Sequence, residues 1–171
     1  MTGQPASKPG TKPGTKYETD YVAWTREQAE MLRSRRWDSL DLDHLIEEIE
    51  DLGDNKLDAF EGALTRVVEH LLKLQHGKAA EPRRGWKISV ATHRVNAARL
   101  LRRAKSLRKL ADLDEIYADG RKLAAKSFES FGDTDPAILP AHCPYTLDQI
   151  LDLDWLPENA GFPEPDSPER A

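Results

Sequence analysis

The feature that most constrains this chain is a helical pattern that runs without interruption from Leu42 to Gln75. Apolar residues recur there at steps of three and four, which places them on one face of an α-helix. They are Leu42, Leu45, Ile46, Ile49, Leu52, Leu57, Phe60, Leu64, Val67, Val68, Leu71 and Leu72. Gly53 lies inside the pattern, but the apolar steps keep their phase across it. The sequence therefore predicts one long central helix over about residues 42–75, capped by Asp41.

Shorter helices are predicted around this one. Helical patterns cover residues 20–34, 84–107 and 111–131. Gly132 fits the position that ends the last of them, and Thr146 forms a capping box with Gln149 at the start of a further short helix. No segment shows sustained alternation of apolar and polar residues, so no sheet is expected. The predicted fold class is all-α, an irregular bundle of about five helices built on the long one.

Composition and length indicate one domain with tails. Residues 1–16 repeat Lys-Pro-Gly-Thr and predict a disordered basic tail, while residues 158–171 are acidic and rich in proline and predict a second one. The helical domain is expected over residues 17–157. We find no apolar run long enough to cross a membrane and no signal-peptide pattern. The single cysteine, Cys143, cannot form an internal disulfide, so a reducing cytoplasm is the expected location.

Charge is segregated along the chain. Residues 38–61 carry ten acidic residues and one basic residue, and residues 82–111 carry ten basic residues and no acidic one. A row of acids follows the long helix about 100° from its apolar face. The row consists of Asp43, Glu47, Glu50, Asp54, Asp58 and Glu61. Since like charges repel, we expect the basic helix to pack against this row, with Arg94 pairing with Glu47 and Glu50.

Several motifs together resemble one family. They are Leu45-Ile46-Glu47-Glu48-Ile49-Glu50-x-Leu52-Gly53, His70-Leu71-Leu72-Lys73, Trp86 with Arg94, and Cys143-Pro144-Tyr145-Thr146-Leu147. Over about residues 17–157 the chain resembles the bacterial family known as domain of unknown function twenty-nine. The resemblance implies an all-helical fold in a bacterial cytoplasm and no settled activity. The candidate interaction or structural-charge residues are Glu47, Glu50, His70, Lys73, Trp86, Arg94 and Tyr145.

An enzyme or metal-binding protein is one alternative. Its candidate residues are Glu47, Glu50 and His70, because two carboxylates three apart share a helical face. On one straight helix, however, His70 lies about 35 Å from Glu47, too far for one site. The sequence contains no phosphate-binding loop, zinc-protease motif or nucleophile elbow. We therefore expect no catalytic residue, metal ligand or cofactor.

A nucleic-acid-binding protein is the other alternative. The basic helix over residues 83–109, with Trp86 near its start, is the surface that would be used. The net charge of −5 and the six acids along the long helix oppose this interpretation. Binding to DNA or RNA, if it occurs, is expected to be weak and non-specific.

The favoured prediction is a non-enzymatic protein-interaction module. A helix of about 50 Å is long for a domain of this size, so part of its apolar face would be buried in a protein partner or a second copy. In a homodimer, an antiparallel copy centred between Asp58 and Ala59 sets Phe60 opposite Leu57. The same arrangement brings Glu47 of one copy to His70 of the other.

Overall fold

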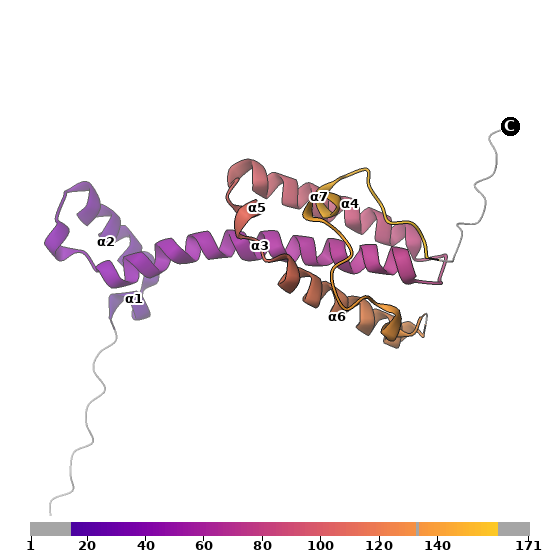
Figure 1. The fold of residues 1–171 in the computed structure, drawn as a ribbon. Coiled ribbons are helices and arrows are strands. Elements are labelled where there is room, and N and C mark those ends of the chain that lie inside the picture. Colours follow the sequence, from indigo (N-terminus) through magenta and orange to yellow (C-terminus); the bar gives the residue numbers. More distant parts are fainter. Residues whose placement is uncertain (1–14, 133, 161–171) are drawn as a thin grey trace, which may run out of the picture. The chain divides into compact units, whose positions relative to one another are not determined.

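The computed structural model describes residues 15–132 and 134–160 of the chain. Within these residues every regular element is a helix, which confirms the all-α prediction (Figure 1). Contacts divide the chain into two compact units, with the division between Leu52 and Gly53. The predicted tails lie outside the described residues, apart from Thr15, Lys16 and residues 158–160. A single domain over residues 17–157 stays a prediction.

The long helix is α3, which spans Leu42–His76. It passes Gly53 without a break, so the prediction of one helix over about 42–75 is confirmed. A Cβ atom at Gly53 would meet nothing within 4 Å, which shows that no close packing requires glycine there. Continuity through this residue follows from the apolar phase on both sides of it.

The first unit contains α1 (Lys16–Thr19), α2 (Tyr21–Arg33), the 3-10 helix η1 (Trp37–Ser39) and the start of α3. Asp20 caps α2 by accepting a hydrogen bond from the backbone N of Ala23 at 3.0 Å. Trp24 is buried, and its Nε1 donates to Asp41 Oδ2 at 3.0 Å. Among the described residues of this unit, only Trp24 and Gln28 are buried. The first unit therefore has a very small core.

The second unit is built on α3 from Gly53 onward. Its other elements are α4 (Arg83–Arg103), α5 (Leu107–Leu110), α6 (Leu113–Phe131), η2 (Pro136–Ile138) and α7 (Leu147–Leu151). Among the described residues, the helices of five or more residues are α2, α3, α4, α6 and α7, in agreement with the prediction of about five; α1 and α5 have four residues each. The core joins α3 residues such as Leu64 and Leu71 to Val90 of α4 and Phe128 of α6.

The predicted basic helix over 84–107 is too long. The chain leaves the helix at Ala104, whose φ is −143° and ψ is 88°, and α5 begins three residues later. Leu107 is only 3% exposed, so the turn serves to bury this leucine in the core. Packing has overridden a local helical pattern, because residues 86–107 contain neither glycine nor proline to end the helix there.

The other predicted helix ends agree closely with the structure. Asp112 accepts hydrogen bonds from the backbone N of Asp114 and Glu115, which starts α6 at Leu113 instead of Ala111. Gly132 ends α6 with a φ of 61°, a left-handed conformation that favours glycine. The capping box of Thr146 and Gln149 is present at the start of α7.

Gly120 sets how closely α6 approaches α3. A Cβ atom there would lie 2.7 Å from Val68 Cγ1 and 3.0 Å from the carbonyl oxygen of Thr65. We expect Gly120→Ala to lower the free energy of unfolding by about 1–3 kcal/mol, because the two helices would be forced apart. Gly62→Ala is the matched control on α3, since a Cβ atom there meets nothing within 4 Å. The control should gain up to about 1 kcal/mol in urea denaturation. Equal effects of the two changes would contradict the close approach.

Candidate functional site

A pocket of about 330 Å³ lies among α3, α4 and α6 in the second unit. Its lining residues are Lys73, Ala79, Pro82, Trp86, Ser127, Phe128 and Phe131. The walls are largely aromatic and aliphatic, and Lys73 is the one ionisable side chain among these described residues. Two residues singled out from the sequence, Lys73 and Trp86, are thus brought together at this pocket.

The ammonium of Lys73 is held by two contacts. Its Nζ donates a hydrogen bond to Glu69 Oε1 at 3.0 Å, one helical turn earlier on α3. The same nitrogen lies 5.4 Å from the centroid of the Trp86 ring, within the range of a cation–π interaction. Lys73 is 7% exposed, so both contacts act with little competition from water.

Glu69 is the buried centre of an ionic cluster. Its Oε2 lies 2.6 Å from Nη1 of Arg66 and 3.5 Å from Nδ1 of His70. Burial alone would raise the pKa of Glu69, but the adjacent His70 ring, the hydrogen bond from Lys73 and the charges of both residues lower this pKa to about 2. The carboxylate is therefore ionised at neutral pH. Its single negative charge partly compensates the positive charges of Arg66 and Lys73.

Two further histidines are partly or wholly buried in this unit. Burial lowers the pKa of His76, and both of its ring nitrogens lack a hydrogen-bond partner among the described residues. Burial, followed by the nearby charges of Arg66 and His70, lowers the pKa of His93. Both rings are therefore favoured in the neutral form at pH 7.

The enzyme alternative gains no metal centre from this geometry. Glu47 and Glu50 are exposed in the first unit, whereas His70 is buried in the second unit beside Glu69. Across the part of the chain that the structure describes, no three histidine, cysteine or acidic side chains gather closely enough to hold a metal ion.

Arg94 does not have the role expected from the sequence. Its guanidinium is buried and donates three hydrogen bonds to backbone carbonyls. The acceptors are the carbonyl oxygens of Gln149 at 2.8 Å, Ile150 at 2.8 Å and Trp155 at 2.7 Å. The expected pairing of Arg94 with Glu47 and Glu50 is wrong, because this side chain fixes the end of α7 and the segment after it.

Tyr145 also holds the C-terminal segment in place. Its hydroxyl donates to Gln75 Oε1 at 2.6 Å, and its ring meets the Trp155 ring edge-on at 5.6 Å. Burial raises the pKa of Tyr145 well above its ordinary value. Cys143 is half-buried, and burial raises the pKa of its thiol, which disfavours the reactive thiolate. Both residues therefore have structural positions.

A different kind of surface lies on α3 in the first unit. Leu42, Ile46 and Ile49, here called the apolar stripe, share one helical face and are 56%, 53% and 66% exposed. The face turned toward α1 and α2 is a separate one: Glu48 accepts hydrogen bonds there from the hydroxyls of Tyr17 and Tyr21. The apolar stripe is thus left open to solvent.

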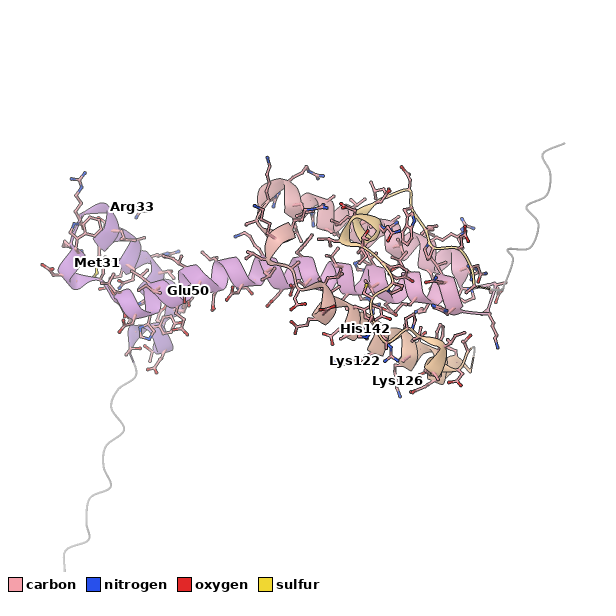
Figure 2. All side chains as sticks on the ribbon, in the orientation of Figure 1. Met31, Arg33, Glu50, Lys122, Lys126 and His142 are labelled. Carbon is pink, nitrogen blue, oxygen red and sulfur yellow. The ribbon has the colours of Figure 1, made fainter. Side chains whose placement is uncertain are left out.

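Acidic side chains border the apolar stripe. Asp43, Glu47 and Glu50, here called the acidic row, are all exposed and lie about 100° around the helix from it. Figure 2 labels Glu50 on this part of α3. A partner for this surface must therefore supply apolar contacts together with positive charge.

The dimer contact expected at Phe60 is wrong in its details. Phe60 and Leu64 are 0% exposed within a single chain, so neither can meet a second copy. His70 is also buried. An antiparallel arrangement centred between Asp58 and Ala59 is therefore excluded, because the apolar face of α3 is already covered there. Whether the chain forms a homodimer through another surface stays a prediction.

Sequence reasoning missed Glu69, although a signal was present. Residues 67–74 are buried around the whole circumference of α3, as expected for a segment that is apolar on nearly every side. Within such a segment, an acid four residues before Lys73 is in position for a buried ion pair.

The family comparison covers most of the chain. A family model described as "Domain of unknown function DUF29" matches residues 16–156. No curated protein and no solved structure matches the chain. Among the described residues, no helix is both long enough and apolar enough to cross a membrane.

Proposed function

This chain belongs to the family described as domain of unknown function DUF29, and we propose that it acts as a non-enzymatic protein-interaction module that binds a second copy of itself. The observation that supports the proposal is the exposed apolar stripe in the first unit, where three large aliphatic side chains are more than half exposed. Contiguous exposed apolar side chains rimmed by polar ones are typical of protein interaction sites. The partner surface can be identified by its chemistry.

The basic face of α4 has the complementary character. We use this name for Arg84, Ile88, Val95, Arg99 and Arg102, which share one side of the helix and are all exposed. Ile88 is 58% exposed and Val95 is 53% exposed. This face carries only positive charges, as does the whole of residues 82–111. One chain therefore carries both an acidic apolar surface and a basic apolar surface.

The two surfaces match in spacing as well as in charge. Leu42 and Ile49 are seven residues apart on α3, and Ile88 and Val95 are seven residues apart on α4. Two helices can therefore bring both apolar pairs into contact at once, about 10 Å apart along each axis. The arginines lie just beyond the ends of the α4 pair, and their long side chains reach the acidic row that borders the stripe.

Pairing of two identical stripes is less favourable. In an antiparallel helix pair, the same flanking positions of both helices face each other. Glu47 and Glu50 would then meet Glu47 and Glu50 of the other copy, and like charges in such positions are destabilising. The stripe of one copy against the basic face of α4 in another avoids this repulsion.

The experiment measures molar mass by light scattering at about 100 µM protein, a concentration that detects micromolar association. The wild-type chain is expected to form a dimer or larger assembly. Ile49→Glu and Val95→Glu should each be monomeric, because each removes one half of the contact. An equimolar mixture of the two variants should associate again, since Ile49→Glu keeps an intact α4 and Val95→Glu keeps an intact stripe. Ile138→Glu, at an exposed residue of η2, is the matched control and should behave as the wild type.

Three outcomes would overturn the proposal. The first is a strictly monomeric wild-type chain. The second is a Val95→Glu variant that still dimerises, which would indicate pairing between two stripes. The third is a monomer that binds a short single-stranded RNA with strong salt dependence, which would assign the arginines of α4 to nucleic acid.

A further inference from the structure

The pocket at Lys73 is lined by none of the residues of the apolar stripe or of the basic face of α4. Its volume of about 330 Å³ falls in the range of small-molecule sites, and its lining is largely apolar with a single charged group. Most residues of such a site contribute packing, and the few polar groups select the ligand. The charge and the position of Lys73 therefore indicate which ligand would fit.

Charge in the cluster behind the pocket is unbalanced. The Glu69 carboxylate is shared by two cations, with Lys73 Nζ at 3.0 Å from one oxygen and Arg66 Nη1 at 2.6 Å from the other. One negative charge against two positive charges leaves a surplus of positive charge. The Arg66 side chain is 45% exposed, whereas Lys73 lines the pocket and is 7% exposed, so the ammonium that shares the Glu69 carboxylate with Arg66 lies beside a poorly hydrated space.

Aromatic rings define the rest of the cavity. Trp86 from α4 and Phe128 from α6 are held by their helices, and Phe128 is 2% exposed. Phe131, which is 83% exposed, also lines the pocket, so an aromatic ring is available to cover an apolar ligand. A sugar or nucleotide would find too few polar partners among these residues.

We propose that this pocket binds a small organic carboxylate with an aromatic or branched hydrocarbon body, and that the carboxylate lies on the Lys73 ammonium. The apolar body packs between Trp86 and the two phenylalanines, from which it displaces water. The carboxylate forms a charge-assisted hydrogen bond with Lys73, whose ammonium carries three donors. The ligand carboxylate adds a second negative charge to a cluster in which one carboxylate, Glu69, contacts two cations, Arg66 and Lys73.

The probe is 3-phenylpropionate, and the matched neutral compound is 3-phenylpropan-1-ol. Isothermal titration calorimetry on the chain of 171 residues at pH 7 should give an affinity for the carboxylate about tenfold or more above that for the alcohol. Lys73→Gln should remove this difference and leave the weak binding of the alcohol. Lys126→Gln is the control, because Lys126 is an exposed lysine on α6 (labelled in Figure 2) that does not line the pocket.

A second variant tests the location of the site without changing the ionic cluster. Ser127 lines the pocket from α6, so Ser127→Trp should fill the cavity and abolish binding of both compounds. If Lys73→Gln does not fold, Ser127→Trp and the comparison of the two compounds still decide the question. Equal affinity for the acid and the alcohol, no binding of either at millimolar concentration, or unchanged binding by Ser127→Trp would each overturn the proposal. These results do not depend on self-association, which uses other residues.

Discussion

Replacing Arg94 with methionine is expected to lower the free energy of unfolding by about 3–5 kcal/mol. The methionine side chain keeps much of the packing volume but removes three hydrogen bonds to the carbonyls of Gln149, Ile150 and Trp155. Those carbonyls would lose charged donors in a region where Arg94 is only 1% exposed. Urea denaturation followed by circular dichroism measures the effect as a lower transition midpoint.

Arg103→Met is the control for Arg94, since Arg103 is an exposed arginine at the end of the same helix. Its free energy of unfolding should change by less than about 0.5 kcal/mol. Arg94→Lys should restore only part of the lost stability, because an ammonium cannot reproduce the planar arrangement of guanidinium donors. A midpoint for Arg94→Met equal to that of the control would refute the anchoring role.

Replacing Glu69 with glutamine is expected to cost about 3 kcal/mol at pH 7. The lowering of its pKa from 4.5 to about 2 corresponds to this order of magnitude. Because the folded pKa lies below the unfolded one, the contribution of Glu69 is present above about pH 4.5 and disappears as the pH falls toward 2. The difference in stability between wild type and variant should therefore shrink over this interval in acid.

A double variant separates loss of the ion pair from loss of packing. Glu69→Leu combined with Lys73→Met replaces both partners by apolar side chains, and should be more stable than Glu69→Gln, which leaves a buried ammonium without its carboxylate. Glu129→Gln, at the exposed end of an ion pair with Lys126, is the control and should change stability by less than about 0.5 kcal/mol. A stability difference that persists unchanged at pH 2 would contradict the assignment to Glu69.

The sequence alone was sufficient to predict elements whose cause is local. The length of α3, the end of α6 at Gly132 and the start of α7 at Thr146 all follow from apolar phase, a left-handed glycine and a capping box. These features depend on residues within a few positions of one another. These elements can therefore be predicted from the sequence before any tertiary contact is known.

Tertiary structure decided where charged side chains are used. Arg94 belongs to a block of ten basic residues, yet its partners are carbonyls more than fifty positions away along the chain. No local pattern distinguishes it from the exposed arginines of α4. Lys73 and Trp86 meet only because α4 packs on α3, which creates a pocket that neither helix has by itself.

The same distinction applies to the apolar face of α3. Its periodicity is uniform from Leu42 to Leu72, so the sequence predicts one continuous surface. In the folded chain Phe60 is 0% exposed and Ile49 is 66% exposed. Helical phase determines which residues share a face, because it depends only on spacing along the chain. Which part of that face is covered depends on where α4 and α6 pack, and this is a property of the three-dimensional fold.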